Sequence, residues 1–148
     1  CNSSYMIPFC FGDGSGTSCP CNTFGASDAG CENSTGAGAV LSAAGSVSLS
    51  ADDLTFSVTG LPNGPGLFFQ GNFAVGAGNG LAFGSGLRCA GGFAVRLEIC
   101  FSSNGSSATS VAIGSLGGAA AGETKRYQYW YRDPNGSRCS EPFNLTNG

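Results

Sequence analysis

The chain has 148 residues, a formal net charge of −3 and only 10% charged residues, where soluble domains usually have about 25%. Its hydrophobic content of 41% is enough for a folded core, and its length suits one domain. The 26 glycines follow no three-residue repeat, which excludes collagen, and no apolar run reaches the roughly 20 residues of a membrane span. Six basic residues, mostly spread singly, form no phosphate-binding patch, so nucleic acid is not an expected partner.

Residues 1–35 form a Cys/Gly-rich segment that we expect to be a loop-rich cap of the same domain. Eight cysteines in a chain without histidine indicate an extracellular or cell-surface location, with disulfides in preference to metal. We expect the chain to be a processed form, because it begins at Cys1 and shows no signal peptide. Cys10, Cys19, Cys21 and Cys31 are expected to form two bonds among themselves, but not Cys19–Cys21, where a bridge across one residue would be strained.

Short apolar stretches separated by Gly, Pro and Asn turns follow from residue 36 onward. Leu54, Phe56 and Val58 alternate with polar residues, which is typical of a half-buried strand. Further strands are expected at 40–41 with 47–49, and at 67–75, 81–83, 93–101, 109–113 and 143–145. No helix of about 10 residues is expected. The predicted fold class is therefore all-β, with residues 36–148 forming a two-sheet antiparallel β-sandwich, Ig-like or jelly-roll.

Residues 125–139 contain the densest aromatic stretch of the chain. Their large side chains fall alternately on the two faces of a strand: Tyr127, Gln128, Tyr129, Trp130, Tyr131 and Arg132. The turn sequence at 133–136 ends this strand. We expect the strand to lie well inside a sheet. Its aromatic rings could form a platform for sugars, but one face must cover the core, so at most half of them would be free.

Several segments together resemble a secreted Cys/Gly-rich β domain common in planctomycetes and similar bacteria. They are FCFGDGSGTSCPC at 9–21, GLPNGPGLFFQG at 60–71, FGSGLRCAGG at 83–92, RYQYWYRDPNGSRC at 126–139 and FNLTN at 143–147. The resemblance implies a secreted or cell-surface β domain, often attached to or repeated within larger proteins, and implies no activity. Cys1 and Cys100 fall outside the family pattern, which implies that they pair and leaves Cys89 with Cys139. The family usually has one more apolar strand after the FNLTN segment.

Asn-x-Ser/Thr triplets number five, more than the roughly two expected by chance, and predict N-linked glycans. They begin at Asn2, Asn33, Asn104, Asn135 and Asn144. Asn104 and Asn135 are the favoured acceptors, because each precedes Gly in a predicted exposed turn.

No catalytic constellation is recognisable, so we predict that the chain is not an enzyme and has no catalytic residues. The absence of histidine excludes Ser-His and Cys-His nucleophiles. A Ser-Lys device would have to use Lys125, at the start of a strand. The carboxylates near strands are Asp52, Asp53, Glu98 and Glu123. The paired aspartates suit a turn, and Glu98 suits cross-strand pairing with an arginine such as Arg96 or Arg132.

Metal and cofactor sites are not expected, apart from a partial Ca²⁺ loop near Asp13. Residues 13–17 place oxygens at alternate positions, as in half of an EF-hand loop. Phe24 stands where the loop would need its closing acidic residue. A Gly-rich turn explains the segment equally well.

The favoured function is an extracellular structural domain that assembles with copies of itself. A missing last strand would expose a sheet edge beside an apolar groove. Tyr5, Ile7 and Phe9 alternate in an extended segment, and residues 1–9 could insert into the groove of the next copy. Such head-to-tail contacts would propagate into a filament or surface layer. The alternatives are that residues 1–9 fold back on their own domain, or that the chain is a carbohydrate-binding or adhesive module of a larger secreted protein.

Overall fold

The computed structural model describes residues 6–136 and 139–148. The strands are β1 (Val40–Ala44), β2 (Thr55–Thr59), β3 (Gly64–Gly71), β4 (Phe73–Ala74), β5 (Leu81–Phe83), β6 (Gly86–Arg88), β7 (Ala90–Gly91), β8 (Val95–Ser102), β9 (Ser106–Ala108), β10 (Arg126–Arg132) and β11 (Phe143–Leu145). The helical segments are η1 (Pro20–Asn22), η2 (Val75–Gly78) and α1 (Ile113–Gly117). No helix among the described residues is long and apolar enough to cross a membrane.

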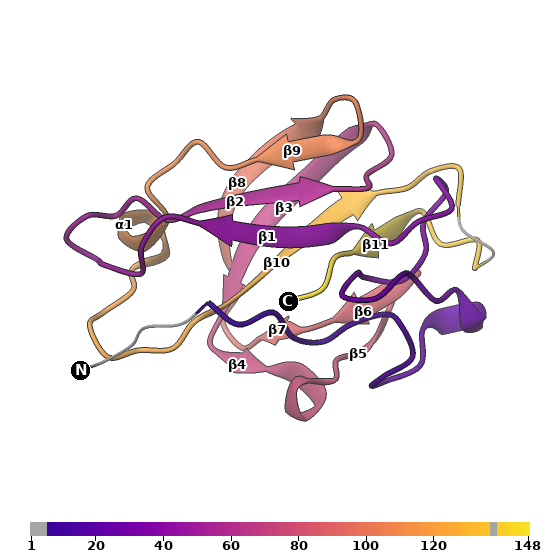
Figure 1. The fold of residues 1–148 in the computed structure, drawn as a ribbon, viewed down its shortest axis with the longest axis horizontal. Helices are drawn as coiled ribbons and strands as arrows, with labels where there is room; N and C mark the ends of the chain where they lie inside the picture. Colours follow the sequence, from indigo (N-terminus) through magenta and orange to yellow (C-terminus); the bar gives the residue numbers. More distant parts are fainter. Residues whose placement is uncertain (1–5, 137–138) are drawn as a thin grey trace.

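Two larger antiparallel sheets organise the chain (Figure 1). One has the strand order β1-β2-β9 and the other β11-β10-β3-β8, while β4 pairs with β7 and β5 with β6. The mainly-β, antiparallel part of the predicted fold class is therefore confirmed. The aromatic strand β10 has a neighbour on each side, so its predicted place inside a sheet is also confirmed.

One apolar core contains side chains from both larger sheets. It consists of Ala39, Leu41, Phe56, Val58, Leu61, Phe68, Leu97, Ile113, Tyr129 and Tyr131. Aromatic pairs tie β10 to its surroundings: the ring of Tyr127 lies 4.7 Å from that of Phe56 in β2, and the ring of Tyr129 lies 4.4 Å from that of Phe68 in β3. Gly66 makes room for Tyr129, because a Cβ at Gly66 would overlap the tyrosine hydroxyl.

The other face of β10 carries a polar clamp centred on the fully buried Gln128. Its Oε1 accepts a hydrogen bond of 2.9 Å from the Cys89 N–H, and its Nε2 donates to the Leu87 carbonyl at 2.8 Å and the Thr146 carbonyl at 2.7 Å. One side chain thereby holds both the β6–β7 segment and the C-terminal segment against the sheet. These are main-chain groups that would otherwise be buried without partners.

Three local predictions about secondary structure are wrong. Residues 47–49 lie in the loop between β1 and β2, and no strand there pairs with 40–41. Ile113, predicted to end a strand, begins α1, whose first turn is capped by Asp52: the carboxylate accepts from the N–H of Gly114 at 2.6 Å and of Ser115 at 2.9 Å. The strands β6 and β7 were not predicted, because the glycine-rich segment 84–92 has no alternating pattern.

The disulfides are Cys10–Cys89, Cys19–Cys31 and Cys21–Cys139. Only one of the two bonds predicted within the N-terminal cysteines forms, and the predicted Cys89–Cys139 bond is wrong. The reason is spatial. The segment before Cys10 pairs with the C-terminal residue Gly148, which brings Cys10 beside Cys89. Cys21 has a positive φ of 54° and bonds to Cys139 after β10.

The predicted Cys1–Cys100 bond cannot be assessed, since Cys1 lies outside the described residues. Cys100 forms no disulfide with any residue in the described ranges.

Candidate assembly groove

A large open groove runs beside the edge strand β1. It has a volume of about 1560 Å³ and is lined by β1, the β1–β2 loop, residues 119–127, the N-terminal residues 6–9 and the C-terminal residues 147–148. Apolar side chains of the core, among them Leu41, Phe56 and Tyr127, contribute to its lining. We call this feature the β1 groove.

The free edge of β1 is only partly paired along the groove. The Ala39 carbonyl accepts from the Gly30 N–H at 2.9 Å. Leu41 is held by the side chain of Asn147, whose Oδ1 accepts from the Leu41 N–H at 2.8 Å and whose Nδ2 donates to the Leu41 carbonyl at 3.4 Å. By the two-residue periodicity of a strand, the next outward-facing groups belong to Ala43. No described residue pairs with them, so an acceptor position for a further strand is open there.

Residues 6–9 line the groove, and Phe9 holds them to the C-terminal residue. Phe9 and Gly148 exchange two main-chain hydrogen bonds, of 3.1 and 3.0 Å, and Phe9 packs beside the disulfide cluster. Ile7, by contrast, is 74% exposed, and Met6 is exposed as well. Of the three predicted assembly residues, therefore, Phe9 is fixed on its own domain, Ile7 is free, and Tyr5 lies outside the described residues.

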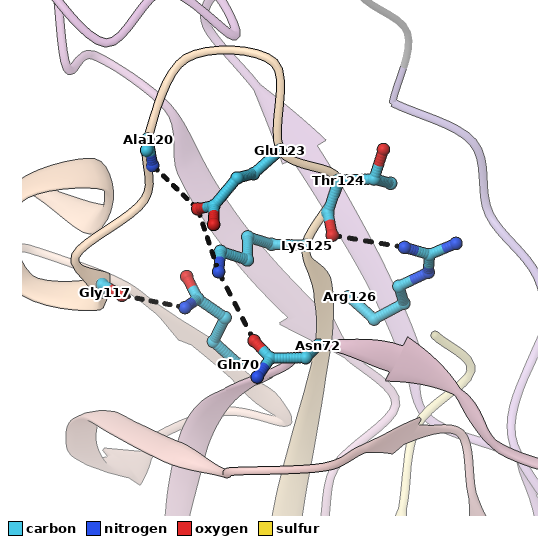
Figure 2. Close-up of polar contacts among 8 residues, drawn as sticks. All are labelled: Gln70, Asn72, Gly117, Ala120, Glu123, Thr124, Lys125 and Arg126. Atoms are coloured by element: carbon cyan, nitrogen blue, oxygen red, sulfur yellow. Dashed lines mark hydrogen bonds and ion pairs between the residues drawn. The ribbon is translucent and has the colours of Figure 1, made fainter.

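The far rim of the groove is the loop 118–125, which polar contacts hold to the sheet (Figure 2). The Lys125 ammonium lies 3.0 Å from the Glu123 carboxylate and donates to Asn72 Oδ1 at 3.3 Å. The same carboxylate accepts from the Ala120 N–H at 2.8 Å. Lys125 is the better-buried partner, with its side chain 14% exposed. The Ala120 N–H first, and then Lys125, lower the pKa of Glu123.

A second contact closes the base of this loop. Gln70 of β3 is buried and its Nε2 donates to the Gly117 carbonyl at 2.9 Å (Figure 2). On the opposite rim, Asp52 caps α1, and Ser115 and Gly114 donors lower the pKa of its carboxyl group. Both rims are thus fixed by hydrogen bonds, so the groove is a built feature rather than a gap between loose loops.

Two of the predicted glycan acceptors are structural side chains. The Asn33 Nδ2 donates to the Gly60 carbonyl at 2.7 Å and to the Tyr131 hydroxyl at 3.0 Å. The Asn144 Nδ2 donates to the Glu32 carbonyl at 3.0 Å. Both side chains are buried and hydrogen-bonded, so the structure favours the other acceptors over these two positions.

The remaining acceptors stay predictions. Asn104 and Asn135 are exposed, each followed by a positive-φ glycine in a turn, as expected from sequence. Asn2 lies outside the described residues.

The rings predicted as a possible sugar platform differ in how deeply they are buried. Tyr129 and Tyr131 are at most 2% exposed, and burial raises the pKa of both hydroxyls. Tyr127 packs on Phe56, and the ring of Trp130 lies 5.7 Å from that of Phe143. Tyr127 and Trp130 are half-buried, so sugar binding by these two rings stays a prediction.

Three of the carboxylates singled out as catalytic candidates, Asp52, Asp53 and Glu98, are bound by serines, and Glu123 is bound by Ala120 and Lys125. Asp53 accepts from the Ser46 N–H at 3.0 Å, and Glu98 accepts from the Ser110 N–H at 2.8 Å rather than pairing with Arg96 or Arg132. Lys125 is paired with Glu123, as described above.

The loop at Asp13 is a local turn. The carboxylate accepts from the Ser15 N–H at 2.9 Å and from the Ser15 hydroxyl at 2.5 Å. Within the part of the chain that the structure describes, no three His, Cys, Asp or Glu side chains are grouped as metal ligands.

Sequence reasoning did not identify the roles of two carboxamides: Asn147, which pairs with the free edge of β1, and Gln128, which clamps the β6–β7 and C-terminal segments. No sequence signal marks them, because their partners are main-chain groups distant along the chain. Comparisons with protein-family models, with curated proteins and with solved structures found no match for this chain.

Proposed function

We propose that the chain is an extracellular structural domain, built as a two-sheet β-sandwich, that assembles head to tail with copies of itself by strand addition. The β1 groove of one copy receives the segment that precedes Phe9 in the next copy. The observation that carries this proposal is the open groove beside an edge strand whose Ala43 N–H and carbonyl have no partner among the described residues.

The size of the groove supports a peptide occupant. Its volume of about 1560 Å³ exceeds the roughly 300–1,000 Å³ typical of small-molecule sites. An added strand gains main-chain hydrogen bonds from the edge and places alternate side chains into the groove. The apolar lining near Leu41 and Tyr127 suits residues such as Ile7 of an incoming segment.

The N-terminal segment supports the role of donor. Ile7 is exposed on its own domain, so its insertion into another copy would break few packing contacts within its own domain. Because Phe9 is tied to Gly148, the proposed donor is limited to residues 1–8. Cys10 and its bond to Cys89 then anchor this donor directly to the body of the domain. Disulfides of this kind also favour the extracellular location.

The test compares the wild-type chain with two variants by sedimentation velocity over a range of concentrations. Ile7→Asp places a charge on the donor. Ala43→Pro removes the outward N–H of the acceptor edge and should leave the β1–β2 ladder intact, since that N–H does not face β2. We expect open-ended growth of the wild type with concentration, and no species larger than a dimer for either variant.

The matched control is Phe93→Asp, which changes a side chain that is 88% exposed and does not line the groove. It should assemble like the wild type. A synthetic peptide of residues 1–8, with Cys1 replaced by Ser, should bind the Ile7→Asp chain but not a chain that also carries Ala43→Pro. Unchanged growth in both single variants would refute the proposal.

A further inference from the structure

A second exposed edge belongs to the four-stranded sheet. Strand β8 is the last strand in the order β11-β10-β3-β8, and only β3 pairs with it along its length. Ile99 and Phe101 point outward from this strand and are 68% and 75% exposed. An exposed apolar edge strand is a ready template for pairing with another chain.

The main-chain groups of these two residues face away from the sheet. Pro65, which is opposite Phe101, has no N–H, so this pair cannot be a hydrogen-bonded pair of the ladder. The hydrogen bonds of β10 agree with this assignment, because the Tyr129 carbonyl accepts from the Thr146 N–H on the side of β10 that faces away from β3. The N–H and carbonyl groups of Ile99 and Phe101 therefore point to the free edge. No described residue bonds to them.

The two halves of β8 differ in how well they are protected. In the first half, the register shifts between Phe68 and Phe69, and the exposed Arg96 lies opposite Phe69. A bulge and a charge are the features by which natural edges avoid pairing. The second half, from Ile99 to Ser102, has neither an outward charge nor a register shift.

Apolar side chains continue inward from this unprotected half. Ile99 is opposite Leu67, which in turn is opposite Trp130 in β10, and Phe101 is opposite Pro65. Ile99 and Phe101 alone expose on the order of 250 Å² of apolar surface. With Leu67 and Trp130, two copies would bury roughly 500–800 Å², which is below the ~1,200 Å² of stable interfaces. The area fits a weak, concentration-dependent contact.

We propose that β8 pairs antiparallel with β8 of a second copy, about a two-fold axis at Cys100. In this register Ile99 of one copy is opposite Phe101 of the other, so both pairs of free main-chain groups meet and the apolar side chains share one face. A second copy is the fitting partner, because its own β8 offers the free main-chain groups and the alternating apolar side chains that complement this edge. This contact does not depend on the β1 groove.

Cys100 supplies a reporter for this register. It would lie opposite its own copy in a non-hydrogen-bonded pair, where Cα atoms are ~4.5 Å apart, within the range of a disulfide. Burial, with Glu98 nearby, raises the pKa of the thiol. The two thiols would therefore stay reduced until an added oxidant removes two electrons and two protons from the pair.

The experiment uses the full chain carrying Ile7→Asp, to remove head-to-tail growth, and Cys1→Ser, to leave Cys100 as the reporter. Sedimentation velocity up to about 1 mM should show a monomer–dimer equilibrium. Ile99→Thr with Phe101→Thr keeps strand propensity but should weaken association by roughly tenfold or more. Phe101→Pro removes an outward N–H and should do the same. Phe93→Thr is the matched control and should dimerise normally.

Treatment with diamide should convert the dimer into a disulfide-linked species whose proteolytic map contains a Cys100–Cys100 peptide. The Ile99→Thr, Phe101→Thr chain should yield little of it. A chain that remains monomeric at 1 mM, or a dimer that is unaffected by the Thr and Pro variants, would overturn the proposal. If Ile7→Asp abolishes open-ended growth and the dimer remains, the β8 contact is separate from the head-to-tail contact in the β1 groove.

Discussion

The β1 and β8 edges differ in what stands beside them. The β1 edge lies in a walled groove, and Asn147 already occupies the main-chain groups of Leu41, so that only those of Ala43 remain open. The β8 edge is bare: Ile99 and Phe101 present both main-chain groups and exposed side chains to solvent.

This difference separates two kinds of pairing. A groove selects an incoming segment by its side chains, so it suits a donor from a different part of the next copy and leads to head-to-tail growth. An edge without a groove requires only another strand as its partner. The same strand of a second copy meets this requirement, so such an edge suits a closed two-fold pair. An unpaired edge therefore does not by itself define the mode of assembly.

The largest expected effect comes from Gln128→Ala, which should loosen the C-terminal segment that carries Asn147 and leave the β8 edge in place. The change leaves three buried main-chain groups without partners, at Cys89, Leu87 and Thr146. The free energy of unfolding should fall by about 3–5 kcal/mol, at ~1–3 kcal/mol for each unsatisfied group with partial relaxation. Urea unfolding with the disulfides intact measures it.

The matched control for that change is Gln70→Ala. Gln70 is also buried but makes one hydrogen bond, to the Gly117 carbonyl, and should cost about 1 kcal/mol. Equal losses in the two alanine variants would mean that the groove side does not depend on the Gln128 clamp.

Alkaline pH should act on both regions together, because Tyr131 lies in the core that the two larger sheets share. Burial raises its pKa above the ordinary value of ~10. The unfolded chain therefore loses this proton first. The stabilisation is complete below about pH 10 and is lost as pH rises above it.

Tyr131→Phe should make the alkaline loss of stability shallower, with little cost at neutral pH because Asn33 still donates to the Gly60 carbonyl. Urea midpoints from pH 7 to 11 test this. An identical alkaline slope in the two chains would contradict it.

Period-two alternation was enough to predict β2 and β10, since each has one face in the core. It gave the existence of β8 but not its faces, because the register shift opposite Phe68 and Phe69 leaves Leu97 buried and turns Ile99 and Phe101 outward. It failed where structure depends on distant partners. Residues 109–113 were predicted as a strand, but none of them forms one: Ile113 begins α1, whose first turn is capped by Asp52, far away in sequence. Cysteine spacing could not give the pairing of Cys10 and Cys21, which depends on the meeting of Phe9 with Gly148.

The candidate site could be anticipated only in outline. The sequence suggested an open edge beside an apolar groove, but it could not say which edge would be open. That depends on Asn147, whose carboxamide imitates a peptide group across from Leu41. The Asn-x-Ser/Thr triplets have a similar limit. An asparagine that could carry a glycan and an asparagine that binds main-chain groups are identical in sequence, so the triplets alone do not separate the two roles.

Asn147→Ala should make the β1 edge more like the β8 edge. It frees the main-chain groups of Leu41, and the loss of two hydrogen bonds should cost about 1–3 kcal/mol. In the Ile7→Asp background, the Leu41 amide should exchange about tenfold faster, while the already free Ile99 amide should not change. Residue-level hydrogen exchange by NMR makes the comparison. Slow exchange of Leu41 in Asn147→Ala would contradict the assigned clamp.

The smallest effect concerns glycans. Native material should carry sugar at Asn104 or Asn135 and none at the buried Asn33 or Asn144. Because Asn104 follows β8 by two residues, a glycan there should weaken β8 pairing, whereas one at Asn135 should not. Glycopeptide mapping before and after enzymatic deglycosylation checks both statements, and a glycan at Asn33 would contradict the first.

The central claim is that residues 1–8 of one copy add a strand to β1 of another. Hydrogen exchange of the Ala43 amide tests it most directly, because this amide has no partner within its own described chain. In wild-type chain at assembling concentration we expect Ala43 to exchange at least about tenfold more slowly than in Ile7→Asp, while Leu41 is unchanged. Equal exchange of Ala43 in the two chains, with assembly present in the wild type, would contradict the account.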